Sequence, residues 1–345
     1  MKKILLAVSA LALSAGAVSA QNVSAGNAEF RLGGYARFGL GYVENRADEW
    51  QTASRLRLQF EMTTTTDGGL TIGARQRFQT EENAANSGGN AAYFYVAYEG
   101  LRVGMGNIIG VVEGSPLLYM NSRSAGIGLE GNGFGSLAAN TVSNDFGFGW
   151  TAYQSAGNVQ SWATNAVEAS YTFQDVTVRA HITDNSYALG ASGTFQGFTA
   201  VVAYEKFDDG IWNGEDVIFA GVGYDAGPWD VALTYARTET TAAGRGGANA
   251  GSATKWSLKG GYDVMPDLNV YGYVARENNG VGNSLGLGGS YALGGGASVE
   301  GGIARTRHGN GRDCKARRDR EGRRGRADGC GHGRNLHALY RLDRH

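Results

Sequence analysis

The most distinctive chemistry in this sequence belongs to arginines of its first third, which recur two residues apart. Arg55 precedes Arg57 and Arg75 precedes Arg77, and no lysine lies between residues 21 and 107. A guanidinium stays charged and has a planar head that stacks, so it acts on charged or dipolar solutes through its field and not by proton transfer. The expected basic set is Arg31, Arg37, Arg55, Arg57, Arg75, Arg77 and Arg102.

The body of the chain lacks the residue patterns of catalysis. No nucleophile motif, phosphate-binding loop or metal-ligand spacing occurs between residues 21 and 306, and no ligand spacing supports a structural calcium ion. A serine hydrolase needs a histidine base. The only histidine of this region is His181, at a position expected to face a lumen. The sequence therefore predicts neither an enzyme nor a cofactor or metal.

The first twenty residues form a secretory leader. Lys2 and Lys3 give a positive start, residues 4–18 are apolar, and small residues precede a cleavage site after Ala20. The apolar run is shorter than the roughly 20 residues that a spanning helix needs. We therefore expect residues 1–20 to be a cleaved signal peptide and the mature chain to be exported.

The rest of the body has the pattern of many short strands. Of 345 residues, 56 are glycine and 3 are proline, a composition that excludes collagen and disfavours helices. Apolar Leu56, Leu58 and Phe60 alternate with polar residues at the two-residue period of a strand. Fifteen strands are expected, at 28–43, 54–66, 69–80, 91–99, 101–107, 165–173, 176–184, 187–195, 198–206, 216–224, 229–238, 254–263, 268–276, 283–292 and 297–305.

The connections alternate between short turns and mostly longer loops. Asp67-Gly68 is a short turn, and 108–164 is the longest loop. This pattern is typical of an all-β, up-and-down barrel that spans a membrane with 21–306. A soluble sandwich would alternate as well, but with its apolar face inward. Two features favour the membrane barrel, which are the paired arginines on the polar faces and the aromatics at the ends of the apolar faces. A closed barrel is also one of the only two structures, with helices, that satisfy their backbone in lipid.

The end of the chain departs from this pattern. Residues 307–345 contain 12 Lys+Arg against 5 Asp+Glu, whereas residues 21–306 contain 17 against 27. The tail has no Val, Ile, Thr, Ser or Phe. Single-chain bacterial barrels have an even number of strands, so fifteen strands leave the closing one unaccounted for. We interpret the tail as the product of a reading-frame shift near residue 306, with the closing strand lost.

Two functional interpretations of the tail are weaker. Cys314, Cys330, His332 and His337 lack the close cysteine pair of a zinc finger. A basic stretch can contact phosphates, but an exported barrel meets no nucleic acid. We therefore expect a charged, solvated segment.

Two stretches of the body resemble the general diffusion porins of alphaproteobacterial outer membranes. They read ASRLRLQF at 53–60 followed by TTTDGGL at 64–70, and SYALGGGASVEGGIA at 290–304. The resemblance covers about 28–305. It implies a sixteen-stranded barrel, usually a homotrimer, that is inserted by the outer-membrane barrel assembly machinery and contacts lipid and lipopolysaccharide. It also implies that the third long loop, here 108–164, folds into the lumen and narrows it.

The resemblance further implies a transverse field in the pore. Family members place a basic cluster on the wall opposite acids of the inward loop, which here are Glu113, Glu130 and Asp145. Such a field orients dipolar solutes and disfavours apolar ones. The arginines could instead be paired structurally with Glu29 and Glu61 on neighbouring strands, and this alternative stays open.

Together these features predict a water-filled channel in the outer membrane of a Gram-negative bacterium, for passive diffusion of ions and small hydrophilic solutes. A substrate-selective channel, for example a sugar channel with Tyr93 and Tyr95 on an aromatic track, and a structural barrel without a through-pore are the alternatives. The acidic body favours cations at the mouth, whereas the arginines favour anions at the narrowest point. We expect a weak cation preference.

Overall fold

The fold is one antiparallel sheet. The computed structural model describes residues 22–25, 28–43, 50–81, 88–119, 149–154, 165–209, 214–240, 251–277, 282–306 and 334–342. Among these, no helix is long and apolar enough to cross a membrane. The strands are β1 (Asn22–Ala25), β2 (Ala28–Val43), β3 (Trp50–Thr65), β4 (Thr71–Glu81), β5 (Gly88–Gly89), β6 (Tyr93–Tyr98), β7 (Leu101–Gly106), β8 (Ala166–Phe173), β9 (Val176–Thr183), β10 (Ser186–Phe195), β11 (Phe198–Phe207), β12 (Asp216–Asp225), β13 (Trp229–Thr240), β14 (Gly251–Met265), β15 (Leu268–Glu277), β16 (Gly282–Gly294), β17 (Ala297–Thr306) and β18 (Arg334–Leu342).

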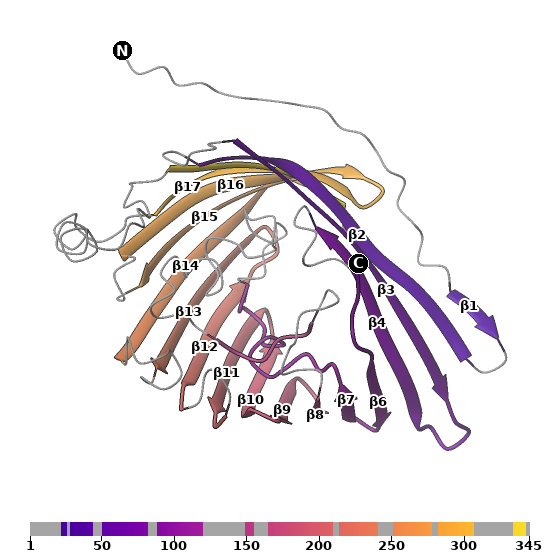
Figure 1. Cartoon of the computed structure of the whole chain (residues 1–345). Helices are drawn as coiled ribbons and strands as arrows, with labels where there is room; N and C mark the ends of the chain where they lie inside the picture. Colours follow the sequence, from indigo (N-terminus) through magenta and orange to yellow (C-terminus); the bar gives the residue numbers. More distant parts are fainter. Residues whose placement is uncertain are drawn as a thin grey trace, which may run out of the picture.

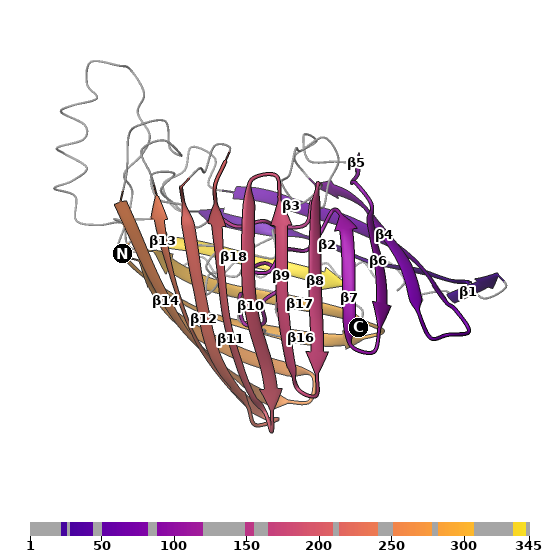
Figure 2. The same ribbon diagram turned by 90° about the horizontal axis from the view of Figure 1, so that it is seen from below.

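Sixteen of these strands form the wall of a barrel. Each pairs with its neighbour along the chain, with β4 pairing directly to β6, and the pairs β9–β10 and β17–β18 continue the series. The last strand, β18, also pairs with β2, so the ladder of hydrogen bonds returns to its beginning. Figure 1 shows the strands arranged around a central space, and Figure 2 shows β8–β14 on one side of the barrel with β2, β3 and β16–β18 behind them. The short strands β1 and β5 add only to β2 and β4.

The two faces of the sheet have the reverse of the polarity found in soluble proteins. On β11, Val202 is 53% exposed, whereas Glu205 is fully buried. Phe195 and Phe198, beside the turn that joins β10 to β11, are each 62% exposed. A continuous apolar surface of this kind would aggregate in water, but hydrocarbon solvates it. The apolar face is therefore the outer, lipid-facing one. All fifteen strands predicted from the sequence are present.

The closing strand is where the structure corrects the sequence-based expectation. Arg334–Leu342 lies in the tail that was expected to supply no strand, yet it forms β18 between β17 and β2. Without it, both edges would expose unpaired backbone groups to lipid, each at a cost of several kcal/mol. Its register sets Ala338 opposite Leu40 and Tyr340 opposite Phe38, so apolar positions of the two strands coincide. The rest of the tail, 307–333 and 343–345, lies outside the described residues.

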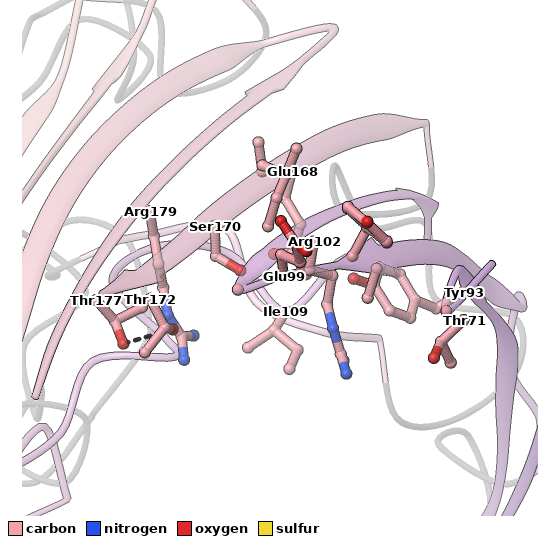
Figure 3. A pocket seen from close by; sticks show the side chains of 16 residues that line it. Thr71, Tyr93, Glu99, Arg102, Ile109, Glu168, Ser170, Thr172, Thr177 and Arg179 are labelled. Carbon is pink, nitrogen blue, oxygen red and sulfur yellow. Dashed lines mark hydrogen bonds between the residues drawn. The ribbon is translucent and has the colours of Figure 1, made fainter. Parts of the chain in front are cut away.

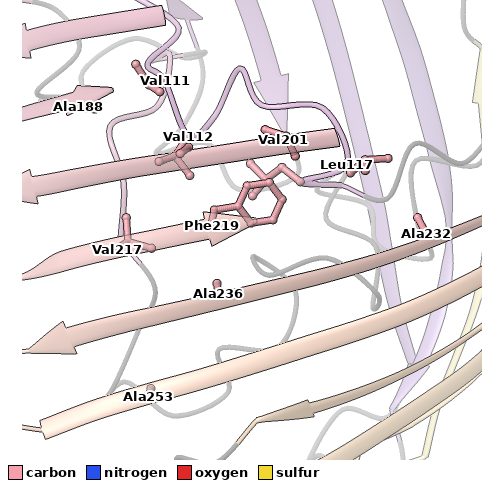
Figure 4. Close-up of a cluster of buried hydrophobic side chains, with 12 residues drawn as sticks. Val111, Val112, Leu117, Ala188, Val201, Val217, Phe219, Ala232, Ala236 and Ala253 are labelled. Carbon is pink, nitrogen blue, oxygen red and sulfur yellow. The ribbon is translucent and has the colours of Figure 1, made fainter. Parts of the chain in front are cut away.

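The interior is occupied by part of the long connection between β7 and β8. We call its described parts, Asn107–Tyr119 and 149–154, the inward segment. Val111, Val112, Leu117 and Leu118 are buried against the inner faces of β10–β14, as Figure 4 shows for most of this cluster. The facing strand residues are mostly small or branched: Ala188, Val201, Ala203, Val217, Phe219, Ala232, Ala236 and Ala253. At Gly190, a Cβ would collide with the Val111 side chain, so the wall is shaped to receive this segment.

Deletion of residues 334–345 should prevent assembly of the barrel, because β17 and β2 lose their shared partner. The measurement is the heat-dependent electrophoretic mobility that marks a folded outer-membrane barrel, after expression with the native leader. Deletion of 343–345 alone serves as the control. Equal amounts of folded protein from both truncations would contradict the assignment of β18 as the closing strand.

Candidate functional site: the basic wall and the inward segment

The predicted basic residues lie on one continuous part of the inner face, which we call the basic wall. Arg37 of β2 stands opposite Arg55 of β3, and Arg57 stands opposite Gln79 of β4. Arg37 is buried, and Arg31 and Arg102 are exposed. The arginines share the parity that the alternation predicted, but their burial differs widely.

Tyrosine rings are the main partners of the guanidinium groups. The guanidinium carbons of Arg75 and Arg77 lie 4.6 and 4.4 Å from the ring centre of Tyr153, in the inward segment. Tyr35 lies under Arg37 and Arg57 at 5.5 and 5.1 Å. Each contact has the geometry of a cation–π interaction. The inward segment thus meets the basic wall through an aromatic ring.

Glutamine amides fix two of the arginines in addition. Arg57 Nε donates to Gln79 Oε1 at 2.7 Å, and Arg77 Nε donates to Gln59 Oε1 at 2.6 Å. Both pairs are cross-strand neighbours on the inner face, where directly opposed side chains interact. The wall is therefore a preorganised set of charges and not a fringe of free side chains.

Glu113, one of the three predicted loop acids, is held by hydrogen bonds within the inward segment. Glu113 accepts hydrogen bonds from Tyr119 Oη at 2.7 Å and from Trp150 Nε1 at 2.8 Å, so its carboxylate joins the two parts of the inward segment. Burial raises the pKa of the Tyr119 hydroxyl above its ordinary value, and the Glu113 carboxylate adds to this rise. Tyr119 therefore stays a neutral donor.

The other two predicted loop acids, Glu130 and Asp145, lie outside the described residues. The strand acids of the pairing alternative, Glu61 and Glu29, have different neighbours. Glu61 of β3 stands opposite Arg31 of β2 and Arg75 of β4, which fits the alternative of structural pairing for these two arginines. Glu29 stands opposite Thr63 and has no such arginine neighbour in its register pair.

Tyr93 and Tyr95 face inward, which the sequence left ambiguous. Their rings stack with centres 5.7 Å apart, while Phe94 and Tyr98 on the other face are exposed. Tyr93 is only 2% exposed, so little of it can contact a solute. Its hydroxyl end covers Gly104, where a Cβ would collide with the ring.

Arg102 lines a hollow beside these rings. It stacks on Tyr95 at 4.0 Å and borders a cavity of about 470 Å³ that is also lined by Arg179 and Glu168 (Figure 3). Thr172 and Thr177, at its edge, share a hydrogen bond of 2.9 Å. The cavity combines both signs of charge with hydroxyl groups, a lining suited to water and polar solutes.

Sequence reasoning missed a buried polar cluster on the opposite wall. Glu205 of β11 is fully buried, and its Oε1 lies 3.4 Å from His181 Nε2 and 3.0 Å from Ser186 Oγ. The signal was present, because Glu205 shares the inward parity of Val201 and Ala203. It was hidden because both faces of β11 are apolar, the inner one being covered by the inward segment.

This cluster has the residue types of a hydrolytic triad but not its arrangement. His181 Nδ1 accepts the backbone N–H of Val111 at 3.0 Å, so the ring proton sits on Nε2 and points toward Glu205. A triad needs a free Nε2 to take the serine proton. Within the described residues, no group of three or more His, Cys, Asp or Glu side chains could hold a metal ion.

Two lysines of β14 extend the basic inner face beyond the predicted set. Lys255 is fully buried and Lys259 is 4% exposed, with its amine 5.2 Å from the ring centre of Tyr271. Their inward parity in β14 was a readable signal. Basic groups thus stand on the inner face far from β2–β4 as well.

Comparison with known proteins decides the family. Residues 7–311 match the Gram-negative porin family. The chain belongs to this family. It is 30% identical over 216 residues to a porin of Fuscovulum blasticum, which covers 58% of this chain and 71% of that protein. It is 27% identical over 183 residues to a porin of Rhodobacter capsulatus, covering 52% and 57% of the two chains.

Solved structures agree with the fold of this porin. A triple mutant of Rhodopseudomonas blastica porin superposes with a TM-score of 0.67 at 23% identity, over 91% of this chain and all of that one. A structure described as showing asymmetric conductivity of engineered proteins gives 0.67 at 23% identity, over 92% and 100%. These matches show the fold, and membership of the porin family makes the protein an outer-membrane channel for diffusion of small solutes.

Replacement of Tyr153 by leucine should destabilise the barrel by roughly 1–2 kcal/mol, because Arg75 and Arg77 lose the ring between them. Tyr153→Phe is the matched control. It keeps the ring and removes a buried hydroxyl that has no hydrogen-bond partner among the described residues. The midpoint of denaturant unfolding in lipid vesicles measures both. Equal midpoints for the two variants would contradict the stacking.

Proposed function

We propose that this porin is a water-filled pore for passive diffusion of ions and small hydrophilic solutes, and that its selectivity is set where the inward segment meets the basic wall. The observation that carries the proposal is the contact of Tyr153 with Arg75 and Arg77. It brings the loop and the wall together at one level of the barrel. Solutes that pass beside this contact meet oriented guanidinium groups.

The wall favours small anionic or dipolar solutes at this level. Arg57 and Arg77 contact neutral rings and amides, which leave their positive charge in place, while Glu61 stands opposite Arg31 and Arg75. Glu113, the described acid of the loop, is held by Tyr119 and Trp150. A low-dielectric wall with one sign of charge concentrates counter-ions. An aromatic sugar track receives no support, because Tyr93 is buried.

The cellular setting follows from the same features. We infer that residues 1–20 direct export and are removed after Ala20, and that 21–306 with β18 forms the barrel. The exposed aromatic and aliphatic outer face fits contact with outer-membrane lipid and lipopolysaccharide, and with two further copies in a homotrimer. Insertion would then use the barrel assembly machinery. The proposal needs no cofactor.

Purified protein in planar bilayers should produce stepwise, nearly ohmic conductance, because passive diffusion has no gating charge to move. Uptake of uncharged sugars into liposomes should rise linearly with concentration. Saturable uptake would favour a substrate-selective channel instead. A folded protein without any steps would be a structural barrel.

Replacement of both Arg75 and Arg77 by glutamine should shift the reversal potential in a salt gradient toward cations, because two positive charges leave the wall. Replacement of Arg237 by glutamine is the control, since this arginine lies on β13 beside Glu239 with its side chain 45% exposed. An unchanged reversal potential in the double variant would remove the basic wall from the account of selectivity.

A further inference from the structure

The cavity bordered by Arg102 and Arg179 lies between the inward segment and the short-turn end of the barrel. Ile109 of the inward segment lines it on one side, and the short turns that contain Gly69 and Gly100 line it on the other. Short turns mark the periplasmic end of outer-membrane barrels. A solute in this cavity would therefore lie on the periplasmic side of the inward segment.

The two arginines of the cavity flank one serine in a single row across the sheet. Arg102 of β7 stands opposite Ser170 of β8, and Ser170 stands opposite Arg179 of β9. Neighbouring strands lie about 4.8 Å apart, so the backbone positions of the two arginines are roughly 10 Å from each other. Figure 3 shows the three side chains extending to the same side of the sheet. Two cations and a hydroxyl group thus face one space.

Both guanidinium groups keep their positive charge in this row. Arg102 stacks on the Tyr95 ring at 4.0 Å, a contact that orients the cation without neutralising it. Arg179 Nη1 lies where a Cβ on Gly114 would collide with it, and its Nε makes no hydrogen bond to the described residues. No carboxylate of the described residues forms an ion pair with either arginine. The row is therefore a place where an anion finds two cations.

Two acids also line the cavity and limit the charge that it accepts. Glu168 of β8, two residues before Ser170, accepts a hydrogen bond from Gly110 N at 3.2 Å. Glu99 lies in the exposed turn between β6 and β7, where water and salt screen its charge. Two guanidinium groups and one nearby carboxylate leave a single positive charge at the row. A ligand with one negative charge balances it, whereas a second negative charge would be repelled by Glu168.

We propose that this cavity binds a small monocarboxylate through Arg102, Arg179 and the Ser170 hydroxyl. The planar guanidinium fork matches the geometry of a carboxylate. A volume of about 470 Å³ falls in the range of small-molecule sites and exceeds the needs of a halide ion. Ile109 and Ala97 offer apolar contact to the body of the ligand. The site deepens the proposed function, and it rests on that function only for its effect on conduction.

Ligand-observed NMR titration of sodium lactate with folded, detergent-solubilised protein measures the binding directly. The native protein should show saturable binding, and Arg102→Gln and Arg179→Gln should each weaken it roughly tenfold, the factor for loss of one charge-assisted hydrogen bond. Arg237→Gln is the matched control, because this side chain is 45% exposed on β13. Glycerol, which is uncharged and of similar size, should show no saturable binding. Equal lactate affinity in all four proteins, or no saturation in the native protein, would overturn the proposal.

A variant that does not fold leaves the test intact. If Arg179→Gln fails to fold, Arg102→Gln decides the question, because the Arg102 side chain is exposed and its loss leaves no buried gap. Arg179→Lys then adds a second comparison. It keeps the charge but loses the planar fork, so lactate should bind it more weakly than the native protein. Native affinity in both of these variants would contradict the site.

Succinate tests the charge balance of the cavity. The native protein should bind this dianion roughly tenfold more weakly than lactate, because the second carboxylate meets Glu168. Glu168→Gln should reduce the difference between the two ligands. Tighter binding of succinate than of lactate by the native protein would contradict the assignment to monocarboxylates.

Conductance separates this site from the pore itself. In planar bilayers, the native conductance should level off as the sodium lactate concentration rises, while it keeps rising in sodium chloride. Arg179→Gln should remove the levelling in lactate. Saturable lactate binding by folded protein that gives no channel steps would refute only the pore. Channel steps without saturable lactate binding would refute only the carboxylate site.

Discussion

The structure depends on one constraint, which is that backbone polar groups in lipid must find their partners within the protein. A sheet meets it only if every strand has two neighbours. All sixteen barrel strands have two neighbours because β18 pairs with both β17 and β2. This requirement explains why a basic tail supplies a strand at all. Arg334–Leu342 forms β18 and completes the ladder, and the apolar residues Leu336, Ala338 and Tyr340 share one parity along it.

The same sheet has two different inner surfaces. Between β10 and β14 the inner face carries a patch of small and apolar side chains on which Val111, Val112, Leu117 and Leu118 pack. From β2 to β4 it is basic and carries glutamines that hold the guanidinium groups. The inward segment is bound to the first surface by side-chain acceptors for its backbone, and it contacts the second through Tyr153. One loop thus contacts both an apolar and a basic part of the inner face.

Aromatic rings take part in the electrostatics of the site beside carboxylates. Glu61 stands opposite Arg31 and Arg75, whereas the Tyr153 ring contacts Arg75 and Arg77 and leaves their charge in place. The Glu113 carboxylate accepts hydrogen bonds from two side chains of the inward segment itself.

The sequence by itself determined the barrel class, the fifteen strand positions and the inward face of the arginines, because a period of two residues maps directly onto the two faces of a strand. It also carried the family resemblance. Tertiary structure alone decided the partners of those arginines, the burial of Glu205 beside His181, and the closing role of β18. These features join residues far apart in the chain, and Glu205 lay in a strand whose two apolar faces conceal the alternation. Which apolar face is covered by a loop and which by lipid is a property of the folded barrel.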